Sequence, residues 1–523
     1  MSSDTGSGSL DAHFRELERL LARTEQALAE DRLEEAAVRA QVSASFAWLN
    51  HTGVFACERL EAVLQEIGRR IASSPPVRQQ VRSRSVLHVA TQVYPTGGHT
   101  QMLANWIRQD RSHRHELALV AQGDQPLPKK VGDALEGRPA LRLDDHPDSL
   151  VNRAQRLRRA MREVETVVLH VHPHDVVPAL ALADEDGPTV WFVNHADHVF
   201  WVGAGAAHRI VNLRESGARL NVERRGVGPG QQALLIRPVA LPDRTVGRAE
   251  AKRRLGVAEG LFVVASAAAG SKYEPIDGVG FLDVLEPLLA RRDDVRLLVA
   301  GPSPDGRWAE LERRGRGRAL GLLPDAGPLL DAADIYVDSF PFASLTSMLE
   351  AAGRGVPVVS LRPPSDEPQV LGADTPELDE VLVVAESAEQ LCDRVGELLD
   401  DGRRRSCLGS ATRESMARNH GAARWADAAG RLLDTPVPAD ADRVAVHSVR
   451  RTGVLDERVR LVQAQVGISG TDGALLMNAG LLQPRERWGL ALRGLGDGRR
   501  PTLPELLGTR WTRRVRARRR VRP

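Results

Sequence analysis

Residues 333–361 read ADIYVDSFPFASLTSMLEAAGRGVPVVSL, and this stretch decides the fold of the chain around it. An apolar run, ADIYVDSF (333–340), leads through a short polar loop into a helix of small residues that starts near Ser344. A second apolar run, VPVVSL (356–361), follows the helix. Two short apolar strands joined by a helix are typical of a parallel sheet that is buried on both faces. The stretch therefore predicts an α/β protein.

The same alternation of apolar runs and helices extends on both sides of this stretch. Further runs lie at 261–267, 295–301, 318–323 and 380–384, and an earlier series lies at 86–90, 116–121, 140–143, 166–172, 188–195 and 208–213. Each series predicts a doubly wound, Rossmann-like domain, and we place these domains at 80–240 and 241–435. Two such domains in tandem face a cleft, with ligands at the carboxyl ends of the strands.

The two ends of the chain have a different texture. Residues 1–9 are rich in Ser and Gly and are expected to be disordered, whereas 10–78 carry the apolar spacing of a helical hairpin and a third helix. These helices could form a docking surface or a cap on the next domain. Residues 436–523 form a C-terminal extension that is partly helical, with strand or loop character over 470–498 and an Arg-rich tail.

Composition excludes several classes of protein. The chain has 71 Lys and Arg against 69 Asp and Glu, so it lacks the charge signature of a nucleic-acid-binding protein. No run of about 18 apolar residues predicts a membrane span, and the first residues do not resemble a secretory signal. The three cysteines fall in predicted helices and are expected to be buried and reduced. The strong preference for Arg over Lys is typical of a GC-rich genome, and the interpretation is a cytoplasmic bacterial protein.

The last residues, TRRVRARRRVRP (512–523), are the one strong local concentration of charge. Two interpretations remain open for this tail. It could be a solvated, disordered segment, or it could bring the protein to anionic lipid at the inner face of the membrane.

The opening stretch also suggests a binding site. The helix after 333–340 begins at the sheet edge where ligands bind, and a helix N-terminus attracts anions. Ser344, Thr346 and Ser347 add hydroxyl donors, and Glu350 could accept from a pair of sugar hydroxyls. Alternatively, Ser344 is only the N-cap of the helix. Lys272, in AGSKYEP after the first strand of the same domain, supplies a second anion-binding element. Together these residues predict a site for a nucleoside diphosphate.

At this point the sequence resembles a known family. The run from 321 to 361 is similar to the nucleotide-sugar-binding half of GT-B glycosyltransferases, and it is closest to the O-GlcNAc-transferase-like group. The resemblance implies that Thr346 and Ser347 hold phosphates, Glu350 the ribose and Lys272 the diphosphate leaving group. It also implies that backbone at Leu322 and Leu323 meets the base, that the donor is a UDP-sugar, and that no metal or other cofactor is needed.

The sequence departs from that family at one position. Many retaining GT-B enzymes carry two glutamates separated by seven residues, and Glu350 matches the second. Phe342 occupies the place of the first. Whether the reaction retains or inverts the sugar configuration is therefore left open.

The first predicted domain supplies the other side of the cleft. Gly97 and Gly98 lie at a strand-to-helix turn, where glycine lets backbone approach a ligand closely, and His99 follows them. Five histidines lie near strand ends of this domain, namely His170, His172, His174, His195 and His198. They could be packing residues, a metal site that includes Asp197, or a general base. We favour His195 as the base, with Asp197 as its orienting partner.

These observations predict a metal-independent glycosyltransferase that moves a hexosyl or N-acetylhexosaminyl group from a nucleotide-diphosphate sugar to a protein, glycan or lipid-linked acceptor. Two alternatives have a different function. A nucleotide-sugar epimerase of the same fold would use the same donor half, and a non-catalytic scaffold would bind nucleotide without turnover.

Overall fold

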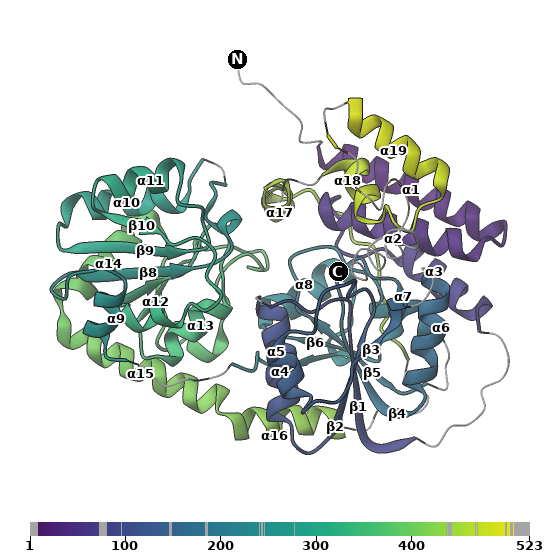
Figure 1. The fold of residues 1–523 in the computed structure, drawn as a ribbon, viewed down its shortest axis with the longest axis horizontal. Coiled ribbons are helices and arrows are strands. Elements are labelled where there is room, and N and C mark those ends of the chain that lie inside the picture. Colours follow the sequence, from purple (N-terminus) through teal and green to yellow (C-terminus); the bar gives the residue numbers. More distant parts are fainter. Residues whose placement is uncertain are drawn as a thin grey trace, which may run out of the picture.

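The computed structural model describes residues 9–72, 81–435, 437, 442–496, 499, 500, 502 and 506, except positions 96, 146–148, 184–186, 240, 242, 243, 245, 277, 466 and 468. Within these residues the chain forms a seven-stranded and a six-stranded sheet, and every strand pair in both sheets is parallel. Figure 1 shows the two sheets side by side with helices around each. The predicted α/β class with two Rossmann-like sheets and an N-terminal helical region is confirmed.

The first sheet has the order β3-β2-β1-β4-β5-β6-β7. Its strands are β1 (Arg82–Ala90), β2 (Arg114–Leu119), β3 (Leu141–Arg142), β4 (Val164–His170), β5 (Thr189–Asn194), β6 (Arg209–Asn212) and β7 (Gln232–Leu234). The sequence pattern predicted the first six, and it missed β7 because three half-exposed residues give no apolar run. The connecting helices are α4 (Gly98–Gln109), α5 (Lys129–Ala134), α6 (Leu150–Met161), α7 (Val177–Ala181) and α8 (Glu215–Arg225).

The second sheet has the order β10-β9-β8-β11-β12-β13. Its strands are β8 (Phe262–Ala267), β9 (Val295–Ala300), β10 (Gly317–Ala319), β11 (Ile335–Val337), β12 (Val358–Leu361) and β13 (Val383–Ala385), and all six were predicted. Its helices are α9 (Arg248–Arg254), α10 (Phe281–Arg291), α11 (Gly306–Arg313), α12 (Gly327–Ala332), α13 (Thr346–Gly353) and α14 (Ala388–Asp400).

Each strand order reverses once, and this reversal positions the site. In the first sheet the chain turns back between β1 and β4, and in the second between β8 and β11. A crevice opens at the carboxyl ends of the two strands on either side of such a switch point, because their connections leave in opposite directions. The loops after β8 and β11 carry Lys272 and Ser344, so the topology brings these two residues to one place.

The N-terminal helices are α1 (Leu10–Ala29), α2 (Leu33–Leu49) and α3 (Glu58–Arg70). Their apolar side chains share one buried cluster with the first sheet. The Glu34 carboxylate on α2 accepts hydrogen bonds from the amides of Leu150 and Val151 at 2.8 and 3.0 Å, which caps the start of α6. Of the two interpretations given above, these contacts match a cap on the first sheet.

Helices α17 (Val454–Ala464), α18 (Gly470–Met477) and α19 (Pro484–Gly496) form the C-terminal extension. The expectation of strand or loop is wrong for Gly470–Met477 and Pro484–Gly496, which are helical, and Ala474 and its apolar neighbours pack in helical register against the N-terminal cluster. Glycines and a proline interrupt this segment and hide its period from sequence reading. The arginines of the predicted tail, 513–522, lie outside the described residues, and so do residues 1–8.

Helices α15 (Gly402–His420) and α16 (Ala422–Asp434) run from the second sheet to the first, along the lower edge of Figure 1. Trp425 of α16 is fully buried beside Trp106 of α4, with ring centroids 5.5 Å apart, and its indole N–H donates to the Ile236 carbonyl at 2.8 Å. The segment proposed as 241–435 therefore ends on the first sheet.

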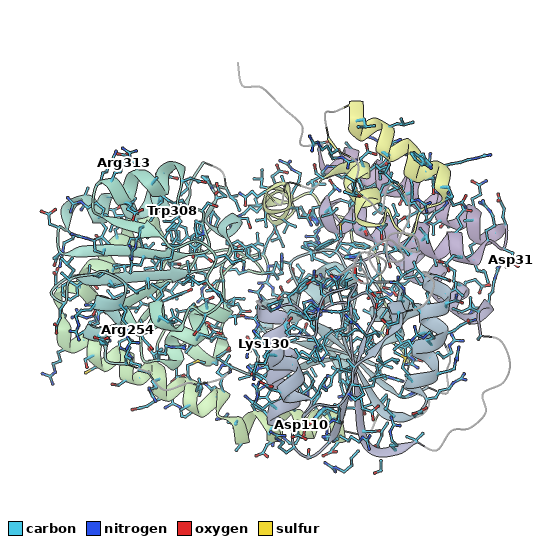
Figure 2. All side chains as sticks on the ribbon, in the orientation of Figure 1. Asp31, Asp110, Lys130, Arg254, Trp308 and Arg313 are labelled. Carbon is cyan, nitrogen blue, oxygen red and sulfur yellow. The ribbon has the colours of Figure 1, made fainter. Side chains whose placement is uncertain are left out.

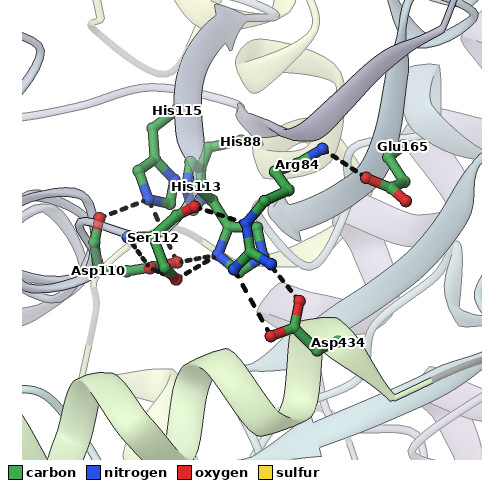
Figure 3. Close-up of polar contacts among 8 residues, drawn as sticks. All are labelled: Arg84, His88, Asp110, Ser112, His113, His115, Glu165 and Asp434. Carbon is green, nitrogen blue, oxygen red and sulfur yellow. Dashed lines mark hydrogen bonds and ion pairs between the residues drawn. The ribbon is translucent and has the colours of Figure 1, made fainter.

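The end of α16 is fixed by the polar cluster in Figure 3. His113 lies between two carboxylates, with Nδ1 2.9 Å from Asp110 and Nε2 3.2 Å from Asp434. The Asp110 carboxylate raises the pKa of His113 above its ordinary value, so His113 favours the charged form that both carboxylates bind.

The cysteines differ from the expectation in one respect. They form no disulfide, and Cys57 is buried, but Cys392 is only half-buried and Cys407 is exposed on α15. Within the described residues, no helix combines the length and apolar character that crossing a bilayer requires.

We predict that Trp425→Ala lowers the free energy of unfolding by about 3–5 kcal/mol, because a fully buried indole and its hydrogen bond are lost. Urea unfolding followed by circular dichroism measures the change. The matched control is Trp488→Ala, since Trp488 is 52% exposed and should cost no more than about 0.5 kcal/mol. Equal effects of the two substitutions would contradict the anchoring role of α16.

Candidate active site

A cleft of about 590 Å³ lies between the two sheets. Side chains and loops from both sheets line it, and it brings together every predicted site residue: Gly97, Gly98, His195, Asp197, Lys272, Leu322, Leu323, Ser344, Thr346, Ser347 and Glu350. His99, His198, Arg237 and Phe342 also line it.

The entry into α13 is strained. Leu345 has φ +54° and ψ −65°, a conformation that non-glycine residues rarely adopt, and the Thr346 amide donates to the Ser344 carbonyl at 2.6 Å. This is a γ-turn, which costs on the order of 1–3 kcal/mol and occurs mainly where function requires it. The residue at the N-cap position, Leu345, makes no capping hydrogen bond with its side chain. Among the described residues, the N-terminus of α13 with Thr346 and Ser347 therefore faces the cleft without a side-chain cap.

Ser344 has a different role from either one predicted. It is not the N-cap, and its hydroxyl donates to the Asp338 carboxylate at 2.6 Å instead of facing a ligand. The same carboxylate oxygen accepts from the Ser344 amide at 3.1 Å. Burial raises the pKa of Asp338, and its second oxygen is buried without a partner among the described residues. Asp338 thus holds the loop that shapes the helix entry, and sequence reading gave it no role.

Lys272 lies in the cleft beside that loop. Its Nζ donates to the Ala343 carbonyl at 2.7 Å and lies 3.9 Å from the centroid of the Phe342 ring. Burial lowers the pKa of Lys272 to about 8, although the nearby Asp338 opposes the shift. Phe342, which replaces a glutamate of the resembling family, therefore packs on the lysine and adds no carboxylate to the site.

The glycine loop of the first sheet meets α13 across the cleft. A Cβ on Gly98 would lie 2.8 Å from Thr346 Oγ1, closer than carbon and oxygen can approach without a shift. Gly97 has φ +108°, which only glycine adopts without strain. Gly98 therefore allows close contact between the two halves, and Gly97 allows the turn before it, whereas the sequence predicted glycines here for close approach to a ligand.

A second cation was missed by sequence reading. Arg237 follows β7 in the segment that leads toward the second sheet, and its side chain lines the cleft. No other described residue binds its guanidinium. Burial and the nearby Arg214 lower its pKa to about 10, so it stays charged at neutral pH. It follows β7, a strand that the sequence pattern did not predict, and no motif includes it.

His195 lies at the end of β5, with its ring centroid 4.4 Å from that of His99. Its Nδ1 lies 3.3 Å from the Val193 carbonyl. Burial, together with the neighbouring His99, lowers the pKa of His195 well below 6.5, so the imidazole is neutral rather than poised near neutral pH.

Asp197 does not orient His195 as expected. Its carboxylate accepts two hydrogen bonds from Arg214, at 2.6 and 2.8 Å. Arg214 keeps the pKa of Asp197 far below its usual range, although burial alone would raise it. The guanidinium of Arg214 also donates to the carbonyls of Gly372, at 2.9 Å, and of Val370, which belong to the second half of the chain. Asp197 therefore positions an arginine that joins the two halves.

Glu350 lies on the second turn of α13, and burial raises its pKa above the ordinary value. Across the cleft, Lys130 of α5 is close enough to oppose that shift, and Figure 2 shows it on the side of the first sheet that faces the second. Leu322 and Leu323 lie in the loop after β10, because that strand ends at Ala319 although the predicted run extended to 323, and Leu322 is 77% exposed.

The other four predicted histidines lie beside other aromatic rings. His170 Nε2 lies 3.0 Å from His88 Nδ1, His174 stacks on Trp48 with centroids 4.9 Å apart, and His198 lies 4.7 Å from the Phe342 ring. His172 packs between Tyr94 and His174. Within the described part of the chain, no cluster of three or more His, Cys, Asp and Glu side chains has the arrangement of a metal site.

The histidines form a hydrogen-bonded chain through the first sheet. His115 Nε2 lies 2.9 Å from the Asp110 carbonyl, His115 Nδ1 lies 2.9 Å from His88 Nε2, and His88 continues to His170. Burial lowers the pKa of His88 and His170 well below 6.5. Neutral rings that each donate through Nε2 satisfy this chain, which runs from the cluster at Asp110 to the strand ends at the cleft.

Comparison with known proteins identifies the fold. The family described as "Glycosyl transferases group 1" matches residues 260–401. Anabaena Alr3699/HepE, solved with UDP and glucose, has 15% identity and a TM-score of 0.54 and covers 67% of this chain and 99% of its own. The chain has a GT-B fold. A glycosyltransferase from Rickettsia africae has 11% identity and a TM-score of 0.52, over 67% of this chain and 98% of its own. No curated protein sequence matches the chain.

We predict that the protein loses stability as pH falls below about 6.5. Burial depresses the pKa of six histidines at the cleft side of the first sheet, to about 4 for His99 and His174, to about 3 for His172, and well below 6.5 for His88, His170 and His195. The unfolded chain then binds more protons than the folded one, so stability is present above pH 6.5 and lost below it. Each histidine should cost roughly 1 kcal/mol between pH 6.5 and 5.5.

Calorimetric melting at pH 7.5, 6.5 and 5.5 measures this loss. His174→Phe keeps a ring against Trp48 and should make the decline shallower. His447→Gln is the control, because the His447 side chain is 62% exposed and should leave the profile unchanged. A Tm that does not fall between pH 6.5 and 5.5 would show that the cluster is not held neutral. His113, whose pKa is raised, acts in the opposite direction and loses its contribution as pH rises.

Proposed function

We propose that the protein is a metal-independent glycosyltransferase that moves a hexosyl or N-acetylhexosaminyl group from a nucleotide-diphosphate sugar, UDP-linked by preference, to an acceptor nucleophile. The observation that carries this proposal is the excess of positive charge at the switch point. Lys272 and Arg237 both line the cleft beside the uncapped N-terminus of α13. The match of residues 260–401 to group 1 glycosyltransferases and the likeness to a UDP-bound GT-B protein support the same conclusion.

The donor binds the second half of the chain. Its diphosphate lies at the amides and hydroxyls of Thr346 and Ser347, with Lys272 and Arg237 as the cations. The ribose hydroxyls meet Glu350, and the base meets backbone at Leu322 and Leu323 at the outer end of the cleft. Fixed positive charge and a helix N-terminus stabilise the negative charge that develops on the departing diphosphate, which is the largest contribution expected in such a reaction.

The acceptor is activated from the first half of the chain. His195 is the general base, and its neutral imidazole has a nitrogen free to take a proton. Its depressed pKa makes it a weak base in the empty site. A bound diphosphate adds negative charge nearby and raises that pKa toward neutrality, so the base is strengthened when the donor is present. Closure of the two halves excludes water from the transfer.

The acceptor class and the stereochemistry are less constrained. A protein, a glycan or a lipid-linked substrate would each fit the open first half of the cleft, and Phe342 supplies no second carboxylate. The resemblance to the O-GlcNAc-transferase-like group rests on the sequence pattern of α13 and Lys272. A nucleotide-sugar epimerase is the nearest alternative. Conversion of the nucleotide sugar without transfer to any acceptor would favour it. Nucleotide binding without any turnover would favour a scaffold.

We predict that UDP raises the Tm of the protein and that Lys272→Met removes most of this shift, because the ammonium beside the diphosphate is lost. At 100 times its dissociation constant, a ligand stabilises by about 2.7 kcal/mol, which thermal-shift assays detect readily. Since burial lowers the pKa of Lys272 to about 8, UDP affinity should also fall as pH rises above 8. The Lys272→Met variant should lose that pH dependence.

The control for this experiment is Lys129→Met, since Lys129 is 89% exposed and paired only with Asp133. It should bind UDP as the natural chain does. Chelator should leave the shift unchanged. A panel with GDP, dTDP, ADP and CMP identifies the nucleotide, and the absence of a shift with all of them would refute the donor site.

His195→Ala should reduce the transfer rate by roughly 10²–10⁴-fold while UDP affinity stays near that of the natural chain, because a base acts on the acceptor and not on donor binding. Transfer is followed by release of UDP from UDP-sugars in the presence of candidate acceptors. His447→Ala serves as the exposed control. A variant that keeps the full rate would exclude His195 as the base, and a variant that loses UDP binding would assign it to the donor site instead.

A further inference from the structure

Helix α19 carries an apolar face that is more than half exposed among the described residues. Trp488, Leu492 and Leu495 are 52%, 65% and 56% exposed, and their spacing places them on one side of the helix. The opposite side, with Leu490, Ala491 and Gly494, is buried. Figure 1 shows α19 at the outer edge of the molecule, beyond α18 and α1. The three exposed side chains, called the α19 stripe below, therefore face outward.

The charge of the chain is concentrated at the same end. Residues 484–523 contain thirteen arginines and three acidic residues, whereas the 483 residues before them contain 58 Lys and Arg and 66 Asp and Glu. The α19 stripe thus belongs to a strongly cationic segment attached to a body with a net negative charge. Arg485, one turn before Trp488, is exposed as well.

We infer that the α19 stripe and the arginines that follow it bind the surface of an anionic lipid bilayer, with α19 lying in the interface. A helix with a Trp and leucines on one face and arginines around it has the composition of an interfacial anchor. The apolar side chains enter the boundary between headgroups and acyl chains, while the arginines attract the lipid phosphates. Two such signals together give stable attachment where either alone is weak.

The same charges disfavour other binding partners for the α19 stripe. A second copy of this chain would bring an identical cationic segment against the first, and like charges at an interface oppose association. The stripe also lies on the outside of a single helix, whereas grooves between elements are where peptides usually dock. A flat anionic surface complements both the shape and the charge.

The test is flotation of the full chain with phosphatidylcholine vesicles and with vesicles that contain about 30% phosphatidylglycerol, at about 0.15 M salt. The natural chain should bind only the anionic vesicles. The variant Trp488→Gln, Leu492→Gln and Leu495→Gln should bind them at least about tenfold more weakly, since the apolar insertion is lost. Substitution of the seven arginines from Arg513 to Arg522 with Gln should weaken binding comparably and remove its dependence on salt.

Val222→Gln with Val454→Gln is the matched control, because these valines are 45% and 72% exposed on other helices and should not matter. The inference is overturned if the α19 variant binds anionic vesicles as well as the natural chain does, or if neutral vesicles bind equally. It is also overturned if the natural chain is a dimer that the α19 variant converts to monomer. The UDP thermal shift is measured without lipid, so failure of the donor site and failure of the anchor are separable.

Discussion

The two halves of the cleft depend on one buried arginine. Arg214 follows β6 in the first sheet, yet its guanidinium binds Asp197 in the same half and the carbonyls of Val370 and Gly372 in the other. The guanidinium of Arg214 is almost fully buried, and its hydrogen bonds to these partners offset the cost of removing its charge from water. The ion pair fixes the loop after β5, and the carbonyl contacts fix the distance of that loop from the second sheet. The position of His195 relative to Lys272 follows from this arginine.

With Arg214 neutralised by Asp197, the cleft still holds unbalanced positive charge. Asp338 is the carboxylate that acts most strongly on Lys272 and it also acts on Arg237, but burial raises the pKa of Asp338, which weakens its charge. Asp338 instead accepts hydrogen bonds from the amide and hydroxyl of Ser344. The next residue, Leu345, is at the centre of the γ-turn that leads into the N-terminus of α13. The strain at Leu345 and the lowered pKa of Lys272 are both costs in the empty protein. A dianionic ligand would offset part of both free-energy costs, because it would neutralise the cations and accept hydrogen bonds from the amides at the start of α13.

The position of a site residue could be predicted from the sequence where the residue directly follows a predicted strand or begins a predicted helix. Lys272 and Thr346 were found because each follows a strand, and parallel strands carry their following loops to one edge. Arg237 was missed because it lies in a link with no period. Asp197 was placed correctly in the cleft but given the wrong partner, since nothing in the local sequence reveals that Arg214 reaches it. Ser344 was expected to face a ligand or to cap α13 and Asp338 was given no role, because a γ-turn leaves no signature when its central residue is a leucine.

The ends of the chain show a further limit of reading domains in order. Asp456 of α17 accepts hydrogen bonds from His51 and Arg224, so residues from three distant segments share one buried carboxylate. With α16 anchored by Trp425, the chain returns from the second sheet to the first and then closes over the N-terminal helices. Order along the sequence suggested separate N- and C-terminal additions, but the contacts join both to the first half, and α17 reaches the second half as well. The first half therefore carries the cap, the extension and α19, while α17 also packs on the second half, where Leu455, Val459 and Val462 share a buried cluster with Ile276, Val370 and Leu371. This shared cluster joins the two halves on the side of α17, so packing holds their relative position together with Arg214.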